Sequence, residues 1–447
     1  MPRSRSATAA VALAAVGAVL AGCGSSATTT SSGSAPGVAQ DPNAPFEVWT
    51  RSTEATAKVY EKIFKSFTEK TGVQVDYKPI FNDFDKQVQQ RAASKDLPDV
   101  VITDTGSLGN FVKQGWTTEV SRDDVAGSGD IVDRAWNNGK GADGKFYAIP
   151  YSTQAMVTLI RKDWREKLGK PIPTTWEELD DLAKAFTFND PDGNGQNDTY
   201  GMLVPGTTDR GYLAWWAASY IWQGGGDILE DEGDGKFRVG IDSPESTKAV
   251  ERLRKLFCED KVMQPGSLTL GTNDAHPLFE SGKSGIYLTG PYMIGRFDKS
   301  VGKDKYEVIA SPKGPAGATV LGEGENIYQM AGSAKTADQK KLAEYLITPE
   351  AQQAGMKGDP QPVVRLPVNK TVDVNATYKD PRWATVAGVY SSEARPFPSV
   401  PNFAPFRQKT SETLNSIFAK CPADSSAELK TLAEALKKEL ENQKASK

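Results

Sequence analysis

Strand-like and helix-like segments alternate from Phe46 onward, and this alternation limits the chain to a small set of folds. Phe46-Glu47-Val48-Trp49 is a short β-rich run, and residues 59–67 carry apolar side chains at helical spacing. Residues 73–77 alternate as a half-buried strand, and residues 98–104 form an apolar run typical of a strand buried on both faces. The order strand, helix, strand, strand predicts an α/β fold with helices packed on a sheet.

The ends of these strands are the first candidate ligand positions. In open α/β sheets, ligands bind beyond the carboxyl ends of the strands. The first strand is followed by residues 50–54 and the strand ending at Thr103 by residues 104–107. Polar side chains in both segments are therefore expected to lie near a bound ligand.

The N-terminus has the three parts of an export signal. Two arginines precede an apolar stretch over residues 7–20, which is too short to span a bilayer. Leu20-Ala21-Gly22-Cys23 follows and resembles the lipobox of bacterial lipoproteins, in which the Cys sulfur carries the lipid. We therefore expect residues 1–23 to be a lipoprotein signal peptide with Cys23 lipidated. The alternative is an ordinary cleaved signal with an incidental cysteine.

Residues 24–45 differ in composition from the rest of the chain. Ser, Thr, Ala, Gly and Pro dominate there, without apolar periodicity, which predicts a flexible tether. About 400 residues of globular composition follow, a length that usually divides into two lobes. No second apolar run is long enough to span a bilayer. We expect an extracytoplasmic protein whose membrane attachment is the lipid at Cys23.

Charge and histidine content limit the function classes. The chain has 53 Lys and Arg against 57 Asp and Glu without a basic block, so nucleic acid is not an expected partner. His276 is the sole histidine and lies in Asn273-Asp274-Ala275-His276-Pro277, a sequence typical of a loop or cap. Ser-His-Asp and Cys-His catalysis and His-rich zinc sites are therefore not expected. A carboxylate pair of the glycosidase kind stays open.

Two cysteines remain once Cys23 is set apart. Cys258 and Cys421 can form one disulfide in an oxidising exterior, or they can be two separate buried thiols. Sequence separation does not decide between these alternatives.

One acidic segment resembles the start of a calcium loop. Side-chain oxygens at the first, third, fifth and ninth positions, with Gly195 at the sixth position for the sharp turn, suit a hard cation. The predicted ligands of a structural Ca²⁺ ion are Asp190, Asp192, Asn194, Gln196 and Asp198. Gly201 stands at the twelfth position instead of Glu, so a carboxylate from elsewhere would have to complete the shell. The alternative is an acidic surface turn held by side-chain-to-backbone bonds.

The order of several motifs resembles the family-1 extracellular solute-binding proteins, the receptors of ABC importers, and especially the carbohydrate-binding, maltose-binding-protein-like members. The motifs cover roughly residues 46 to 420. They are Phe46-Glu47-Val48-Trp49, Phe67-Thr68-Glu69-Lys70-Thr71-Gly72-Val73-Gln74-Val75, Leu97-Pro98-Asp99-Val100-Val101, Tyr147-Ala148-Ile149-Pro150, Arg161-Lys162-Asp163, Thr174-Thr175-Trp176-Glu177-Glu178-Leu179, Phe279-Glu280-Ser281-Gly282-Lys283, Gly290-Pro291-Tyr292, and Ala343-Glu344-Tyr345-Leu346-Ile347-Thr348-Pro349-Glu350-Ala351-Gln352.

The resemblance implies a two-lobe periplasmic-binding-protein-like fold of type II with a multi-strand hinge. Lobe 1 would comprise residues 46–154 plus about 321–365, and lobe 2 residues 155–320 plus about 366–447. The chain would cross between lobes near Gln154, Leu321 and Leu366. Function would be capture of a sugar or oligosaccharide by a monomer and delivery to ABC permease subunits, with no bond broken. The alternatives are an exported polysaccharide-active enzyme and a receptor for a non-sugar solute.

The resemblance also implies a set of ligand residues in the cleft. Aromatic faces cover the C–H surface of a sugar, while carboxylates, amides and Arg bind its hydroxyls. The candidates are Trp49, Arg51, Glu54, Asp104, Thr105, Ser107, Tyr151, Gln154, Trp215, Trp216, Tyr292 and Phe403. Gln154 departs from the acidic residue of related sugar receptors, and Tyr292 replaces the commoner Trp after Gly-Pro. For any single aromatic residue, the alternative is core packing.

Overall fold

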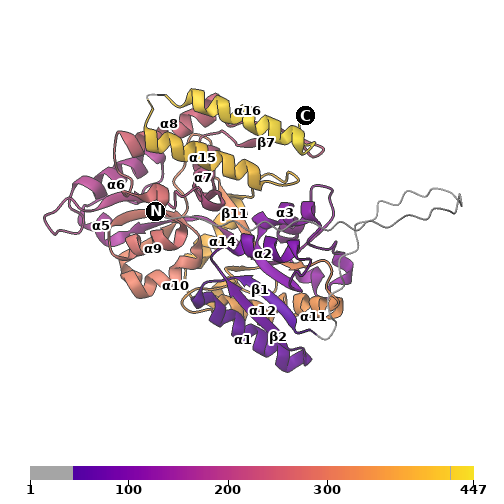
Figure 1. The fold of residues 1–447 in the computed structure, drawn as a ribbon. Helices are drawn as coiled ribbons and strands as arrows, with labels where there is room; N and C mark the ends of the chain where they lie inside the picture. Colours follow the sequence, from indigo (N-terminus) through magenta and orange to yellow (C-terminus); the bar gives the residue numbers. More distant parts are fainter. Residues whose placement is uncertain (1–43, 423) are drawn as a thin grey trace, which may run out of the picture. The chain divides into compact units, whose positions relative to one another are not determined.

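The computed structural model describes residues 44–422 and 424–447. The predicted signal peptide, Cys23 and nearly all of the tether lie outside the described residues. Within them, the chain forms a seven-stranded sheet, a four-stranded sheet and a two-stranded hairpin. We call the first sheet with its covering helices lobe 1 and the second sheet with its helices lobe 2 (Figure 1).

Lobe 1 is built on a sheet of mixed direction with the strand order β12-β4-β11-β3-β1-β2, and β13 pairs with β11. β1 is parallel to β2 and β3, whereas β11 is antiparallel to β3 and β4. Apolar clusters pack on both faces of this sheet. The elements are β1 (Phe46–Arg51), α1 (Glu54–Thr71), β2 (Val75–Ile80), α2 (Phe84–Ala93), β3 (Val100–Asp104), α3 (Leu108–Gln114), α4 (Asp133–Trp136), β4 (Ile149–Ala155), β11 (Val320–Gln329), α11 (Thr336–Leu346), α12 (Pro349–Met356), β12 (Leu366–Pro367) and β13 (Ala394–Arg395).

Lobe 2 is built on a sheet with the order β10-β5-β9-β6, and the hairpin β7-β8 lies apart from it. Helix α15 packs on α7 and α8, and α16 packs on α15 and β8; both are the yellow helices of Figure 1. The elements are β5 (Val157–Arg161), α5 (Lys162–Lys167), α6 (Trp176–Phe188), β6 (Tyr200–Leu203), α7 (Tyr212–Gln223), β7 (Leu229–Gly233), β8 (Lys236–Val239), α8 (Pro244–Cys258), α9 (Thr272–Glu280), β9 (Ser284–Thr289), α10 (Ile294–Phe297), β10 (Tyr306–Ile309), α13 (Val374–Tyr378), α14 (Arg382–Ser392), α15 (Ala404–Lys420) and α16 (Ser426–Asn442).

Local signals in the sequence explain where several helices begin and end. Thr53 caps α1, which ends at Gly72 in the left-handed region with φ 77°. A capping box of Thr175 and Glu178 starts α6, and Thr348 with Pro349 starts α12.

The chain passes between the lobes at β4, β11 and β12, and these three strands are neighbours in the first sheet. β4 ends at Ala155 in the first sheet and β5 begins at Val157 in the second. The N–H of Met156, between them, donates to the carbonyl of Leu321 at the start of β11 over 2.9 Å. β12 pairs with β4 through Leu366 and Thr153. The fold therefore has the multi-strand hinge that was expected, with strands hydrogen-bonded to one another.

The Cys258 and Cys421 side chains form a disulfide. Cys258 is the last residue of α8, and Cys421 follows α15. The bond attaches the C-terminal helices to lobe 2. No helix of the described residues combines the length and the apolar character needed to cross a membrane.

Candidate functional site

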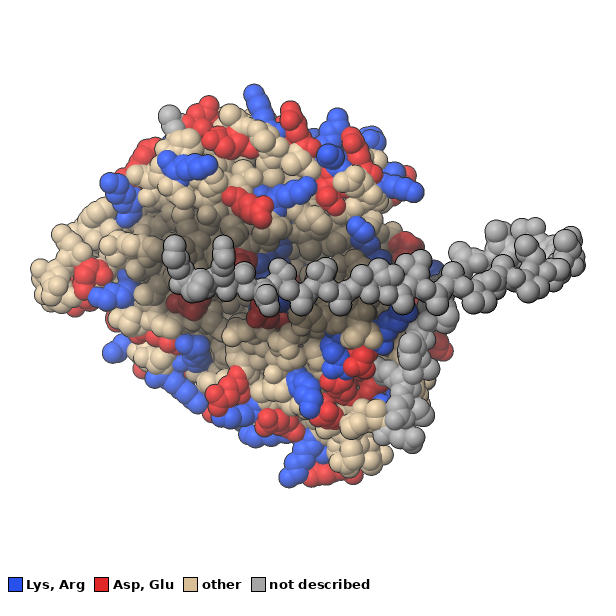
Figure 2. Space-filling model, in the orientation of Figure 1, with Lys and Arg blue, Asp and Glu red and all other residues tan. Residues whose placement is uncertain are grey.

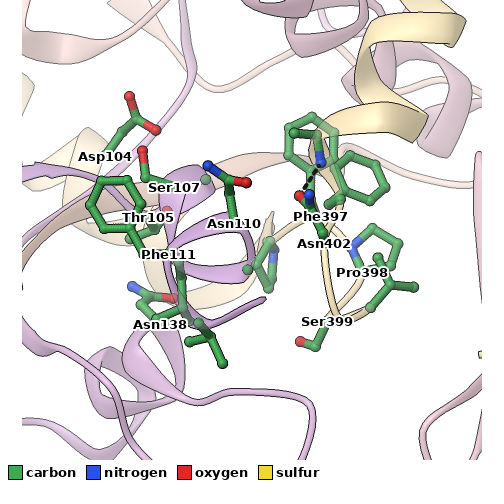
Figure 3. Close-up of a pocket in the computed structure, with 18 of the residues that line it drawn as sticks. Asp104, Thr105, Ser107, Asn110, Phe111, Asn138, Phe397, Pro398, Ser399 and Asn402 are labelled. Atoms are coloured by element: carbon green, nitrogen blue, oxygen red, sulfur yellow. Dashed lines mark hydrogen bonds between the residues drawn. The ribbon is translucent and has the colours of Figure 1, made fainter. Parts of the chain in front are cut away.

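A cavity of about 930 Å³ lies where lobe 1 faces the segment that precedes α15. Figure 2 shows the surface hollowed between the two lobes, with charged side chains around the hollow. Figure 3 shows that the two walls of the cavity come from distant parts of the sequence. One wall carries Asp104, Thr105, Ser107, Asn110, Phe111 and Asn138, and the other carries Phe397, Pro398, Ser399 and Asn402.

The first wall follows the carboxyl end of a central strand, as expected. Asp104 ends β3, a 3₁₀ turn, η1 (Thr105–Ser107), follows, and α3 begins directly at Leu108. The opposite wall approaches closely, because a Cβ at Gly109 would lie 2.6 Å from the carbonyl oxygen of Pro401. Only glycine fits at this contact.

Asp104 is held in its ionised form by arginines of both lobes. Its Oδ2 lies 3.0 Å from Nη2 of Arg210, whose Nε also lies 2.6 Å from Asp85. Burial alone would raise the pKa of Asp104, but the charges of Arg210, Arg51 and Arg407 outweigh burial and lower the pKa to about 2. Asp104 is thus a charged acceptor at any physiological pH.

Glu323 of the hinge strand β11 is a second carboxylate at the cavity. Its Oε1 accepts hydrogen bonds from Trp215 Nε1 and from Gln154 Nε2, each at 3.0 Å. Burial, together with the nearby charge of Asp104, raises the pKa of Glu323. The two acids therefore differ, since the pKa of Asp104 is lowered and the pKa of Glu323 is raised.

Arg407, in the first turn of α15, lines the cavity between these acids. Its Nε donates to the carbonyl of Gly211 over 3.2 Å. Gly211 has φ 67°, and a Cβ there would lie 2.5 Å from Arg407 Cγ, so glycine is required both for the backbone and for the arginine stem. Burial lowers the pKa of Arg407, although Asp104 and Glu323 oppose that shift.

The structure brings several predicted ligand residues together. Asp104, Thr105, Ser107 and Phe403 line the cavity. Gln154 and Trp215 are not part of the lining, but each donates a hydrogen bond to Glu323, which is. Arg51 reaches lobe 2, where its Nη2 donates to the Tyr212 hydroxyl over 2.9 Å.

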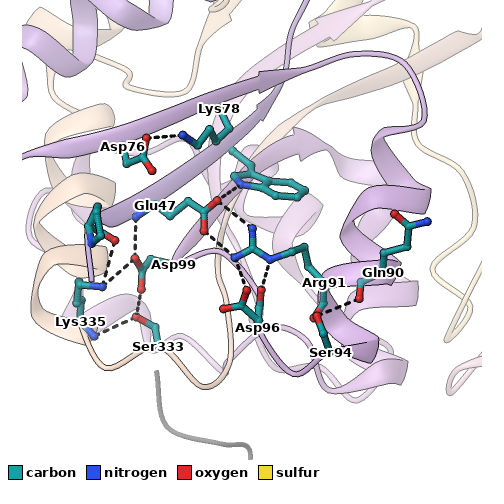
Figure 4. Close-up of polar contacts among 12 residues, drawn as sticks. Glu47, Asp76, Lys78, Gln90, Arg91, Ser94, Asp96, Asp99, Ser333 and Lys335 are labelled. Atoms are coloured by element: carbon teal, nitrogen blue, oxygen red, sulfur yellow. Dashed lines mark hydrogen bonds and ion pairs between the residues drawn. The ribbon is translucent and has the colours of Figure 1, made fainter. Parts of the chain in front are cut away.

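Other predicted ligand residues lie outside the lining of this cavity. Trp49 is 4% exposed, donates its indole N–H to Glu47 and has the Arg91 guanidinium 5.3 Å from its ring centroid. Figure 4 shows this Glu47–Arg91 pair and the adjoining Asp99 contacts. Tyr151 and Trp216 have no exposed surface and belong to the cores of lobes 1 and 2. Every residue of β4 is buried, and so is every residue of α7 after Tyr212, so burial there does not single out one face of either element.

Glu54 and Tyr292 are outside the cavity lining too. Glu54 begins α1, is largely exposed and pairs with Lys58. Tyr292 is partly buried, and Arg365 lies 5.6 Å from its ring centroid. Neither residue meets the cavity in this conformation.

Sequence reasoning missed Glu323, Arg210, Arg407, Asn110, Asn138 and Asn402. Glu323 was hidden in Gly322-Glu323-Gly324-Glu325, which looks like a loop and yet is the hinge strand. The one available signal was its position two residues after the predicted crossing at Leu321. The three asparagines carry no local motif that distinguishes them from surface residues.

The predicted calcium loop is folded around its own hydrogen bonds. Asp190 accepts from the backbone N–H groups of Gly193, Asn194 and Gly195 at 2.9 to 3.1 Å. Asn194 donates its amide to Asp192 and Asp198, and Asp198 also pairs with Lys283. Across the described residues, no three His, Cys, Asp or Glu side chains are grouped to hold a metal. Calcium binding by Asp190, Asp192, Asn194, Gln196 and Asp198 stays a prediction.

His276 lies in helix α9 instead of the expected loop. Its ring is 1% exposed and contacts Tyr287, Tyr292 and Phe297. This packing outweighs the N–H bond that Pro277 removes from the helix. Burial and the charge of Arg296 lower the pKa of His276 to about 3, so the ring is neutral.

Comparison with known proteins places these features in a family. Residues 50–353 match the family model described as bacterial extracellular solute-binding protein. A putative binding protein of Brucella abortus (strain 2308) is 26% identical over 279 residues. That match covers 62% of this chain and 64% of the relative, so it spans less than two thirds of the relative's length.

Two solved structures share the architecture. A solute-binding protein of Thermotoga lettingae TMO bound with α-D-tagatose has a TM-score of 0.78 and 20% identity, covering 88% of this chain and 99% of that chain. Maltose-bound MalE3 of T. maritima has a TM-score of 0.75 and 25% identity, also covering 88% and 99%. The expected α/β two-lobe fold is therefore confirmed. Because the family model matches more than half of its length, the chain belongs to the bacterial extracellular solute-binding proteins.

Proposed function

We propose that this protein is the substrate-binding receptor of an ABC importer and that it captures a sugar or oligosaccharide between its two lobes. The observation that carries the proposal is the cavity itself, because hydroxyl-binding side chains and aromatic rings line it together. Sugar ligands need both kinds of surface. The maltose bound to MalE3 is in keeping with this proposal.

The lining residues divide the work of binding between them. Asp104 supplies a fixed anion that accepts two hydroxyl hydrogen bonds without a proton of its own. The amides of Asn110, Asn138 and Asn402 each offer a donor and an acceptor. Phe397 and Phe403, stacked with ring centroids 4.5 Å apart, offer apolar faces to the C–H surface of a pyranose.

Delivery would follow from closure and attachment. A receptor whose lobes close over the ligand presents both lobe surfaces together, and this is what permease subunits can distinguish from the empty form.

We propose that lipid on Cys23 keeps the receptor at the cell membrane, outside the cytoplasm. Cys23→Ser should release soluble or uncleaved protein from the membrane fraction. An unchanged amount of protein in the membrane fraction would contradict the lipid anchor.

Calorimetric titration against a panel of mono- and oligosaccharides tests the proposed function. We expect at least one sugar to bind and to raise the melting temperature, since a ligand that binds only the folded state stabilises it. Chromatography of the sugar recovered after incubation distinguishes a receptor from the alternative, an exported enzyme. Unchanged sugar supports a receptor, and released products would identify an enzyme with a carboxylate pair.

A further inference from the structure

Cations outnumber acids around the cavity although the chain as a whole is acidic. Five Lys and Arg and four Asp and Glu line the cavity, whereas the whole sequence has 53 basic and 57 acidic residues. One arginine, Arg210, pairs with two of the four acids, Asp85 and Asp104. The other two acids, Glu323 and Asp143, accept hydrogen bonds from neutral groups.

Four lining cations therefore lack a carboxylate partner in the described part of the chain. They are Lys113, Arg134, Lys140 and Arg407, none of which forms an ion pair with a described residue. Arg134 is fixed on its side of the cavity, because it donates to the carbonyls of Ser391 and Ala394 and lies 4.8 Å from the Tyr390 ring centroid. The positive charge is thus distributed over both walls.

Arg407 is the most closely positioned of the four. Its Nε is occupied by Gly211, and its guanidinium carbon lies 5.8 Å from the Phe397 ring centroid. Neither of its Nη atoms donates a hydrogen bond to a described residue. A Cβ at Gly106 would lie 3.6 Å from Nη1 and 3.2 Å from Asp104 Oδ1, so the bare glycine leaves room beside both groups.

This arrangement suits an anion better than a neutral ligand. The two free nitrogens of a guanidinium held by its Nε match the two oxygens of a carboxylate or a phosphate. An excess of one charge sign in a cleft with low-dielectric walls also favours a ligand of the opposite sign. The charges of Asp104 and Glu323 act on Arg407, but neither carboxylate forms an ion pair with it, and Asp104 is bound by Arg210.

We infer that the ligand of this cavity is an anionic sugar, whose carboxylate or phosphate group binds Arg407 while its hydroxyls bind Asp104 and the lining amides. The inference rests on the proposed function and narrows its substrate class. Uronic acids and sugar phosphates share this chemistry, and the experiment distinguishes them.

The test is calorimetry with matched ligands on the full-length protein. The series are glucose, glucuronate and glucose 6-phosphate, then the corresponding galactose compounds, and the neutral and uronate disaccharides of each. We expect a uronate or phosphate to bind at least tenfold more tightly than its neutral counterpart. Raising the salt concentration from 0.05 to 0.5 M should lower the affinity for the anionic ligand severalfold. The affinity for neutral sugars should stay nearly unchanged, because salt screens only the charged contact.

Substitution of Arg407 tests whether this residue causes the preference for the anionic ligand. Arg407→Gln should abolish the preference for the anion, and Arg407→Lys should restore part of it. Arg238→Gln is the matched control, because Arg238 pairs with Glu230 and Glu232 within the hairpin of lobe 2, outside the cavity lining. If Arg407→Gln fails to fold, the salt dependence of ligand affinity in the wild type decides whether the ligand is an anion.

The outcomes separate the two proposals. Neutral sugars that bind as tightly as their anionic partners would overturn the anionic ligand and leave the sugar receptor intact. Binding of none of the sugars would overturn the proposed function and the inference with it.

Discussion

His276 makes the stability of this protein depend on pH in a way that one substitution can isolate. The buried ring takes up a proton only near pH 3, whereas the exposed ring of the unfolded chain does so below about 6.5. The unfolded state therefore binds more protons between these values, and the free energy of unfolding falls as pH decreases. His276 is the sole histidine, so no other imidazole contributes.

The loss due to His276 should be about 2 kcal/mol between pH 7 and pH 5. We expect His276→Gln, which keeps a polar group for Tyr287, to show a smaller loss over the same interval. Denaturant unfolding at both pH values measures the difference. Parallel pH profiles for the wild type and the variant would show that folding does not lower the pKa of His276.

Trp215 and Trp176 form a matched pair for separating binding from packing. Each donates its indole N–H to a polar side chain, Trp215 to Glu323 over 3.0 Å and Trp176 to the buried Gln223 over 2.8 Å. Trp215→Phe should weaken ligand binding about tenfold, because Glu323 loses one of its two donors. Trp176→Phe should lower the melting temperature and leave the affinity of the folded fraction unchanged.

Calorimetry on both variants, with thermal melts, decides between the roles of the two tryptophans. Loss of affinity in Trp176→Phe alongside normal binding in Trp215→Phe would show that the hinge carboxylate does not serve the cavity.

Some site residues could be predicted from the sequence because chemistry and position coincide in one local motif. Asp104, Thr105 and Ser107 follow an apolar strand, and strand ends in α/β sheets are where ligands bind. Arg407 and Glu323 gave no such signal. Arg407 and Asp104 lie on the same cavity although about 300 residues separate them in the sequence, and tertiary packing of that range leaves no periodic trace in the sequence.

At the scale of elements, the helices with caps were the most predictable. Thr53, Thr175 and Thr348 satisfy free N–H groups at helix starts, so the backbone itself requires such residues. The segment over residues 396–403 was predicted as part of the site only at Phe403. It has no regular structure, and its place is fixed by contacts such as that of Gln443 with Asn402.

The acidic loop offers an element-scale prediction. If it binds calcium, chelation should lower the melting temperature by several degrees, since metal held only by the folded state stabilises it. Asp192→Ala with Asn194→Ala should remove this sensitivity, and Asp231→Ala, in the hairpin, should keep it. Identical melting of the wild type with and without chelator would contradict calcium binding and leave the loop as the hydrogen-bonded turn described above.

At the scale of the whole molecule, Arg210 ties the lobes together. It precedes α7 in lobe 2, and both of its carboxylate partners belong to lobe 1. Its own backbone has φ 52°, an uncommon conformation for a residue other than glycine. The charge contacts across the cleft hold the lobes in the arrangement described here.

Arg210→Gln should favour the open form of the ligand-free protein, with a small effect of about 1 kcal/mol because the ion pairs are partly exposed. Small-angle X-ray scattering should then give a larger radius of gyration than for the wild type. Arg238→Gln is again the control, because its partners lie within one lobe. An unchanged radius in Arg210→Gln would mean that the hinge alone sets the lobe positions.

The C-terminal segment has a consequence for biosynthesis. The last strand of the structure ends at Arg395, so a chain released at that point would contain every strand of both sheets. It would nevertheless lack the second wall of the cavity and the arginine at the start of α15. Under the proposed function, a nascent chain that ends before α15 has both sheets but cannot bind its solute.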